Sequence, residues 1–472
     1  MTALVWLRRD LRVHDHPALH VAHQRDELVI PVFCFDDRLL HGRHASGART
    51  QFLLESLSDL DMSLRGRGGG LVIRHGDPVN ELVALAERTG ARIVHASVDA
   101  GPFARRRDRH AVRRLREAGI ELCGHPGTFV TDDLASLQTG GGGSYTVFTP
   151  FHRAWLKAPR REFHRAPRHL PPLPSDLDPG AIRSLAKLRL DQPLGNPAPG
   201  GESAARAAVT AFLRGTVERY AESRDDLGHD GTSRLSPYLH FGCMSARELE
   251  QRVVDRGGAG PAAFRRQLRW RDFYAHVLRA HPDDAGREHQ ERYRGTLSWT
   301  DDRERFDAWR DGRTGYPLVD AAMRQLATEG WMHNRARLVV GSFLTKDLGI
   351  DWRWGERHFM RLLLDGDQAS NNGNWQWIAS VGVDPQPVFR RIFNPRRQQE
   401  RFDADGRYVR RHVPELRDVP DEHLAEPRRM PVEVQTAIRC RIGVDYPEPI
   451  VDHATTRREA LQRYGEARGR GR

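Results

Sequence analysis

The spacing of hydrophobic residues changes character along the chain. In the first 130 residues, short continuous apolar runs alternate with segments in which apolar residues recur at helical spacing. The runs cover residues 3–7, 28–35, 71–76 and 92–99, and the helical patterns cover residues 47–65, 78–88 and 102–118. Continuous apolar strands separated by helices are typical of a parallel sheet covered on both faces. We therefore predict an α/β domain over residues 1–130, with a Rossmann-like parallel sheet.

Ligands of such sheets bind beyond the carboxyl ends of the strands. This rule would bring residues 8–12, 34–37 and 99–103 to one edge of the sheet. No G-x-G-x-x-G follows the first strand, and the glycine-rich segment 66–70 precedes a strand instead of opening a helix. We therefore interpret that segment as a loop and do not expect ordinary dinucleotide binding at this edge.

Residues 131–201 have the composition of a connector. Residues 140–143 are all glycine, and prolines recur from Pro159 to Pro199, which favours a segment draped over the surface. The aromatic residues of TVFTPFHRAWLK, at 146–157, indicate that part of it docks on the protein.

From residue 202 onward helical patterns dominate and strand signals are nearly absent. The clearest helical patterns cover residues 202–222, 245–255, 261–281 and 317–330. We predict an all-α domain over residues 202–472. The arginine-rich end, residues 457–472, is expected to be a frayed, solvated tail.

Charge changes this picture by indicating a partner. Lys and Arg together number 74 against 63 Asp and Glu, for a formal net charge of +11, and this favours an anionic partner such as nucleic acid. Only three of the 74 are lysine. An arginine bias from codon usage would also explain the charge, so a basic but unspecialised protein is the alternative.

Cysteine usage and the start of the chain bear on location. The four cysteines form no C-x-x-C, so neither a zinc site nor a disulfide framework is expected; they are Cys34, Cys123, Cys243 and Cys440. The N-terminus lacks a secretory pattern, and no apolar stretch reaches transmembrane length. We expect a cytoplasmic protein that binds neither a membrane nor a metal.

Residues 331–377 combine residue types that rarely occur together. Five tryptophans share this stretch with a His-Asn-Arg group, an Asp-Gly-Asp and an Asn-Asn-Gly-Asn. So many indoles are unusual on a solvated surface, and so many amides and charged groups are unusual in an ordinary core. The stretch therefore predicts a lined cavity.

Two further segments could contribute to a site. Residues 231–242, GTSRLSPYLHFG, place hydroxyls and an arginine before a helix, where backbone N–H groups favour a phosphate; a plain capped helix is the alternative. Gln267, Trp270, Arg271 and Tyr274 follow helical spacing on one face. Such a face suits a flat polar ring or a nucleobase.

These motifs together resemble the photolyase and cryptochrome family, and most closely its bacterial cyclobutane pyrimidine dimer photolyases. The resemblance covers nearly the whole chain, with its motifs in order and at matching intervals: LRRDLRVHDHPAL (7–19), GTSRLSPYLHFG (231–242), WRDFY (270–274), GRTGYPLVDAAMRQL (312–326), GWMHNRAR (330–337), DWRWGERHFM (351–360), LLDGDQASNNGNWQW (363–377) and FRRIFNP (389–395). It implies an N-terminal antenna domain and a helical domain that holds FAD in a folded form.

The resemblance also implies the residues that hold FAD. Residues 232–236 would surround its phosphates, Arg337 and Asp365 would form an ion pair, and Asn371 would face the N5 edge of the flavin, where an amide can accept or donate. The full set of expected contacts is Tyr220, Thr232, Ser233, Arg234, Leu235, Ser236, Gln267, Arg271, Trp331, Asn334, Arg337, Asp365, Asp367 and Asn371.

Three tryptophans match the family's electron relay: Trp375, Trp352 and Trp299. The resemblance implies that they carry electrons from the surface to photoexcited oxidised flavin. Together with Asn371 they are the expected catalytic residues.

The expected substrate is DNA that contains cyclobutane pyrimidine dimers. Trp270 and Trp377 would hold a flipped dimer, and Gln267, Asn334 and Arg335 would meet its polar edge and the adjoining backbone. Relatives that repair the (6-4) photoproduct carry histidines where this chain has Asn334 and Leu338, and their chemistry depends on one of them.

Gln267 weakens this substrate prediction. Many dimer photolyases carry Glu there, whereas Gln occurs among (6-4) enzymes and cryptochromes, and Gln cannot supply a proton. A (6-4) photolyase and a cryptochrome-type photoreceptor therefore remain alternatives. The iron–sulfur type of (6-4) enzyme would need four clustered cysteines, and those of this chain are scattered.

The antenna chromophore is predicted from residues 101–108, GPFARRRD. Folate-binding relatives carry an Asn-Glu pair where this chain has Phe103 and Ala104. The resemblance favours 8-hydroxy-5-deazaflavin, with Asp36 and Asp99 as contacts; methenyltetrahydrofolate and an empty pocket are the alternatives. We expect the protein to act as a monomer.

Overall fold

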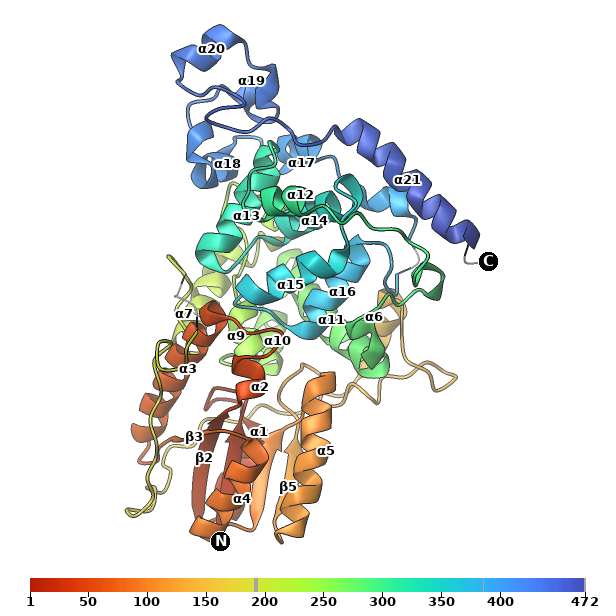
Figure 1. Ribbon diagram of the computed structural model, residues 1–472. Helices are drawn as coiled ribbons and strands as arrows, with labels where there is room; N and C mark the ends of the chain where they lie inside the picture. Colours follow the sequence, from red (N-terminus) through yellow and green to blue (C-terminus); the bar gives the residue numbers. More distant parts are fainter. Residues whose placement is uncertain (191–193, 385, 471–472) are drawn as a thin grey trace.

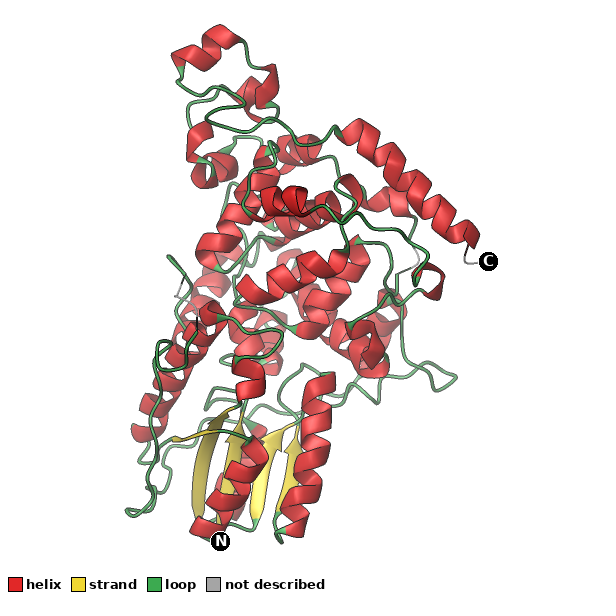
Figure 2. Ribbon diagram, viewed as in Figure 1, coloured by secondary structure: helices red, strands yellow, loops and turns green. Residues whose placement is uncertain are grey.

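The N-terminal part of the protein is a parallel α/β domain. The computed structural model describes residues 1–190, 194–384 and 386–470, and Figures 1 and 2 show the sheet at one end of a larger helical body. The sheet order is β3-β2-β1-β4-β5 and all four pairings are parallel. The strands are β1 (Thr2–Leu7), β2 (Leu28–Phe35), β3 (Val72–His75), β4 (Ile93–Ser97) and β5 (Glu121–His125). The predicted fold class is confirmed.

Alternate residues of each strand enter different hydrophobic clusters. In β1, Val5 and Leu7 pack on one face with residues of the helical domain, while Leu4 and Trp6 pack on the other. Both faces are therefore buried, as the continuous apolar runs predict. The helices of this domain are α1 (Pro17–Arg25), α2 (Asp37–Leu40), α3 (Gly47–Arg65), α4 (Pro78–Thr89) and α5 (Pro102–Glu117), of which α1, α4 and α5 pack on the strands.

Three elements of this domain were missed in the sequence pattern: β5, α1 and the one-turn helix α2. Strand β5 lies at the edge of the sheet and none of its residues is fully buried, so it lacks the apolar run that marks the other strands. Helix α1 is short and is capped by His16, whose ring accepts from the backbone N–H of Leu19. Histidine is not among the residues that usually occupy the N-cap position of a helix.

The connector is anchored at several points. Its later part runs along the sheet edge, where Ile73 N–H donates to Pro179 O at 2.7 Å. Its aromatic segment forms α6 (Phe148–Lys157), which packs on α11 (Ala259–Ala280). Trp155 of α6 is fully buried, and its indole N–H donates to Asp272 at 2.9 Å. The predicted docking of this aromatic segment is confirmed.

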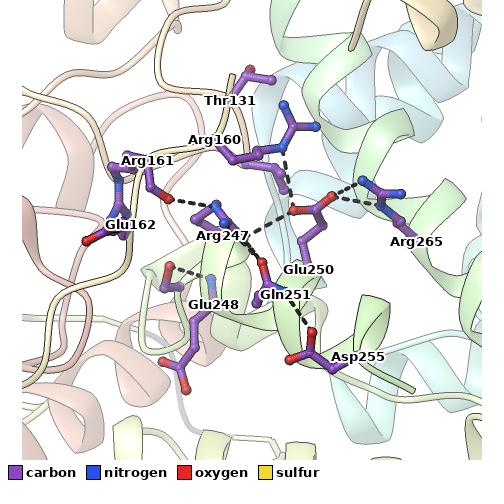
Figure 3. A network of polar contacts seen from close by, with 12 residues as sticks. Thr131, Arg160, Arg161, Glu162, Arg247, Glu248, Glu250, Gln251, Asp255 and Arg265 are labelled. Carbon is purple, nitrogen blue, oxygen red and sulfur yellow. Dashed lines mark hydrogen bonds and ion pairs between the residues drawn. The ribbon is translucent and has the colours of Figure 1, made fainter. Parts of the chain in front are cut away.

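A buried carboxylate ties the connector to the helical domain, as Figure 3 shows. Glu250 of α10 (Ala246–Val254) is 2% exposed. It accepts from Arg265 Nε at 2.7 Å, and it pairs with Arg247 of its own helix and, at 3.5 Å, with Arg160 of the connector. Since a buried charge is costly without partners, these arginines fix the segment after α6 against α10 and α11.

The rest of the chain is helical, as predicted, and α11 is its longest helix. The shorter helices α18 (Arg407–His412), α19 (Asp421–Leu424) and α20 (Val432–Ala437) form a lobe that projects away from the α/β domain (Figure 1). The remaining α-helices are α7 (Glu202–Ala211), α8 (Tyr220–Ser223), α9 (Ser236–Phe241), α12 (Arg303–Arg310), α13 (Pro317–Glu329), α14 (Asn334–Ser342), α15 (Trp352–Leu362), α16 (Gln368–Ile378), α17 (Pro395–Phe402) and α21 (His453–Arg470).

The expectation of a frayed C-terminal tail is wrong for the described residues. Helix α21 packs back on the helical body, and Ala460, Tyr464 and Ala467 are buried there. The Tyr464 hydroxyl donates to Ala379 O. These three residues follow helical spacing, but the arginines around them obscured the narrow apolar stripe.

Candidate functional site

A cavity of about 420 Å³ lies within the helical domain, where α9, α11, α14 and α16 converge. Most of the residues expected to bind a cofactor or substrate line it, although they come from distant parts of the sequence. Those that line it are Tyr220, Thr232, Ser233, Arg234, Leu235, Ser236, Gln267, Trp270, Arg271, Trp331, Asn334, Arg337, Asp365, Asp367, Asn371, Trp375 and Trp377.

One wall of the cavity is the predicted face of α11. Gln267, Trp270, Arg271 and Tyr274 all line it. Arg271 is anchored by donating to the carbonyl oxygens of Thr128 and Leu239, at 2.9 and 3.1 Å. Burial lowers the pKa of this guanidinium and raises that of the Tyr274 phenol, so Tyr274 remains neutral.

The segment before α9 leaves a polar atom available to a ligand. The Thr232 hydroxyl is buried and has no hydrogen-bond partner among the described residues. An unpaired buried hydroxyl is costly, and a ligand that hydrogen-bonds here would remove the cost. Arg234 is less available than expected, because its guanidinium pairs with Glu329 at 3.0 Å and lies 4.3 Å from the centroid of the Trp331 ring.

Charged pairs are concentrated beside the start of α16. Arg337 and Asp365 form an ion pair at 2.9 Å. Asp367 caps α16 by accepting from Ser370 N–H at 2.8 Å, and it accepts from Arg9 of the α/β domain at 2.6 Å. Burial raises the pKa of Asp367, but Arg9 outweighs it, together with other cations nearby, and holds the pKa well below its usual range.

Asn371 of α16 lies deeper in the cavity, whereas Asn374 of the same helix is exposed. Asn371 is 8% exposed, and its amide nitrogen donates to Glu356 O at 3.0 Å. This bond orients the side chain and leaves the amide oxygen and one N–H for a ligand. Asn374, one turn later, accepts from the Tyr274 hydroxyl at 3.2 Å.

The open part of the cavity has an aromatic lining. Asn334 is exposed, and Trp270 and Trp377 are half-buried, whereas Trp375 is 3% exposed. The indole N–H of Trp377 donates to Asp384 at 3.0 Å. The cavity thus runs from an aromatic mouth to a polar interior.

Other expected residues lie outside the lining of this cavity. Trp352 is fully buried, with its indole N–H 3.4 Å from Glu288 Oε1, and Trp299 is half-buried. Arg335 pairs with Asp225 at 3.0 Å instead of entering the cavity. Asp36 and Asp99 lie beyond the carboxyl ends of β2 and β4. Asp36 pairs with Arg38, and Asp99 pairs with Arg9.

Several lining residues were not among the expected contacts. The signal for Asn374 was present, because it follows Asn371 at the spacing of one helical turn. His240 carried no such signal; burial and the nearby Arg9 hold its pKa well below the usual value, so the ring is neutral. These residues are Leu239, His240, Phe264, Leu268, Met332, Leu338, Phe359, Leu363, Ser370, Asn374 and Ile378.

Comparison with known proteins identifies the family. Residues 3–174 match the family described as DNA photolyase, and residues 264–466 match the FAD binding domain of DNA photolyase. A Streptomyces griseus protein named deoxyribodipyrimidine photo-lyase is 42% identical over 483 residues, which cover 99% of each chain. This chain belongs to the DNA photolyase family. The suspected resemblance is confirmed, and most of the cavity lining falls within the photolyase FAD-binding domain.

Solved structures agree with the photolyase assignment. The crystal structure of a bacterial class III photolyase from Agrobacterium tumefaciens superposes with a TM-score of 0.92 at 36% identity, over 99% of this chain and 98% of that one. A Synechocystis cryptochrome superposes with a TM-score of 0.88 at 31% identity, over 98% of both chains. The two-part architecture is therefore shared with a protein named photolyase and with one named cryptochrome.

Among the described residues, no helix has the length and apolarity to cross a membrane. The same residues contain no group of three or more His, Cys, Asp or Glu side chains placed to hold a metal ion.

Proposed function

We propose that this protein is a deoxyribodipyrimidine photolyase that uses light to reverse cyclobutane pyrimidine dimers in DNA. One observation supports it most directly: two half-buried tryptophans, Trp270 and Trp377, share the mouth of the cavity with Asn334 and Leu338, and the buried Asn371 lies in its interior. Neither Asn334 nor Leu338 is the histidine that (6-4) repair relies on.

The polar interior fits FAD. Thr232 offers its unpaired buried hydroxyl to a phosphate or ribose, together with the hydroxyls of Ser233 and Ser236. The isoalloxazine edge would be held by donors and acceptors of the Arg337–Asp365 pair, Asp367 and Asn371. When bound, reduced FAD supplies one electron to the dimer upon absorbing light and recovers it after the ring has opened.

The residues at the mouth recognise the lesion. Photolyases are among the enzymes that flip their target out of the duplex, and the flat faces of Trp270 and Trp377 suit the apolar rings of a dimer. Gln267 and Asn334 each offer an amide to its carbonyl and N–H edge. Arg335 pairs with Asp225 outside the cavity. We infer that it contacts the DNA backbone, a partner that the positive net charge also favours.

The relay tryptophans restore the reduced cofactor. Trp375 lines the cavity, Trp352 is fully buried and Trp299 is half-buried. Exposure therefore differs between the two ends of the relay: Trp375 lines the cavity, and Trp299 is partly exposed. This arrangement suits the passage of electrons from the surface to the cavity. Glu288, near the Trp352 indole N–H, is an acceptor that would favour an oxidised indole there.

We also propose a deazaflavin antenna at the carboxyl edge of the sheet. The order β3-β2-β1-β4-β5 places the ends of β1 and β4 at the point where the strand order reverses, which is the usual ligand site of such sheets. Asp99 follows β4 there, and Asp36 follows β2. Reconstitution with 8-hydroxy-5-deazaflavin, with methenyltetrahydrofolate as comparison, checks this by the absorbance that stays with the protein after gel filtration.

One experiment tests the proposed repair function. Purified protein with chemically reduced FAD is mixed with oligonucleotides that carry either a cyclobutane dimer or a (6-4) photoproduct, in light and in darkness. We expect light-dependent reversal of the dimer alone. Reversal of the (6-4) product would reassign the substrate, and no reversal of either lesion by the FAD-loaded protein would favour a photoreceptor.

A further inference from the structure

The tryptophan proposed to hold the lesion has an aromatic ring behind it. Phe148, the first residue of α6, stacks on Trp270 with ring centroids 3.7 Å apart and planes within 5° of parallel. Phe148 is 7% exposed, whereas Trp270 is half-buried and lines the cavity. One face of the indole is therefore covered by the connector, while the side chain still lines the cavity.

Phe148 cannot easily follow the indole if the indole moves. At the other end of α6, Trp155 is fully buried and its indole N–H donates to Asp272. The centroid of its ring lies 4.1 Å from the guanidinium carbon of Arg160. Arg160 in turn belongs to the Glu250 network of Figure 3, which fixes this segment to α10 and α11. Helix α6 is thus a rigid support for the ring that it presents.

The stack extends beyond the two rings. Arg266, one helical turn before Trp270, is exposed, and its guanidinium carbon lies 5.3 Å from the Phe148 centroid. A cation over an aromatic ring stabilises the position of that ring. Phe273 packs edge-on against both Phe148 and Trp270, at 5.7 and 5.6 Å, so the indole plane is restrained from two directions.

We propose that Phe148 is a positioning residue for lesion recognition. By backing Trp270, it holds the indole plane in the orientation that accepts a flipped dimer before DNA arrives. A binding surface that is already ordered spends less free energy on ordering when the ligand binds. This inference rests on the proposed function, because it needs Trp270 to contact the lesion. The effect should be specific to damaged DNA, since flipping costs more free energy for intact, stacked base pairs.

The test measures binding in darkness, so repair activity is not its readout. Affinities of FAD-loaded protein for a dimer-containing oligonucleotide and for the undamaged oligonucleotide give a selectivity ratio. Phe148→Leu should lower this ratio about fivefold, the scale of one aromatic stack, and leave undamaged affinity unchanged. Phe148→Tyr keeps the ring and should restore the ratio. If the leucine variant does not fold, Phe148→Met removes the ring with a more adaptable side chain.

Phe151→Leu is the matched control. Phe151 lies one turn later in the same helix, is fully buried, and packs on Phe273 and Tyr145. Its replacement should lower the melting temperature with no change in selectivity. A ratio that falls equally in both variants would show that general loosening of α6, and not the stack, is responsible.

A double-mutant cycle separates this inference from the proposed function. If Phe148 acts through Trp270, then Phe148→Leu should have no further effect on selectivity in a Trp270→Leu background. An equal, additive loss in that background would overturn the inference. An unchanged ratio in Trp270→Leu alone would instead remove Trp270 from lesion binding, and the proposed site would fail with it. A lower ratio in Trp270→Leu but not in Phe148→Leu would overturn the positioning role alone.

Discussion

Arg9 of the α/β domain donates a hydrogen bond to Asp367 at 2.6 Å and so reaches the cavity of the helical domain. Its Nε also donates to His240 O at 2.9 Å. Asp367 caps α16, the helix that carries Asn371 and Trp375. The segment that follows the first strand therefore helps to fix the first turn of a helix in the proposed flavin site.

Arg9→Gln should loosen that turn. Without the guanidinium, the buried Asp367 carboxylate loses its strongest partner, and we expect a loss of about 1–3 kcal/mol in stability at neutral pH with faster release of FAD. Because Arg9 holds the folded-state pKa of Asp367 below its ordinary value, the stabilisation is complete above that ordinary value and is lost as pH falls below it.

Melting curves of the two FAD-loaded proteins between pH 7 and pH 3 check this prediction. The difference in melting temperature should stay constant down to about pH 5 and narrow below the ordinary carboxyl range. A difference that widens on acidification would mean that another group carries the effect.

Arg337→Gln should weaken FAD binding about tenfold. The change removes the ion pair with Asp365 inside the cavity, and a charge-assisted hydrogen bond of this kind is worth roughly 1.5–3 kcal/mol. Flavin fluorescence during dilution measures the retention of the cofactor.

Arg324→Gln is a suitable control, because Arg324 pairs with Glu415 at 2.8 Å with similar exposure but does not line the cavity. It should leave flavin retention unchanged. Equal loss of flavin from both variants would point to general destabilisation.

Trp375→Phe should separate photoreduction from repair. Phenylalanine is much harder to oxidise than an indole, so light-driven reduction of the oxidised cofactor should slow by at least about tenfold. Repair by chemically reduced protein does not need the relay and should be spared. Absorbance changes under blue light follow the first activity, and dimer reversal follows the second. Equal loss of both would contradict the relay assignment.

Much of this molecule could be predicted from local patterns. The limits of β2 and α3 match the residues 28–35 and 47–65 expected from them, since continuous apolar runs and helical spacing are determined within a few neighbouring residues. The face of α11 that lines the cavity follows from the same spacing.

Contacts between distant residues could not be predicted in this way. Arg9 and Asp367 are 358 positions apart, and nothing near either residue indicates the other. The same holds for Phe148 behind Trp270. Arg335 was expected at the lesion, but its side chain pairs with Asp225, a partner that only the packing of the loops around α8 and α14 brings within reach.

Asp403→Asn should remove one source of pH-dependent stability. Asp403 is 4% exposed, and burial raises its pKa to about 6, even though it accepts from the N–H groups of Tyr408 and Val409 at 2.9 and 3.0 Å. In this case the folded pKa lies above the ordinary value. The native state therefore binds more protons between about pH 4 and pH 6, and this group makes the protein less stable as pH rises through that window.

Asparagine does not titrate and keeps one acceptor for α18. The measurement is the free energy of unfolding of both proteins at pH 4 and at pH 7. Between these two pH values, the wild type should lose about 1–3 kcal/mol of stability relative to the variant. A difference that does not change with pH would place the raised pKa elsewhere.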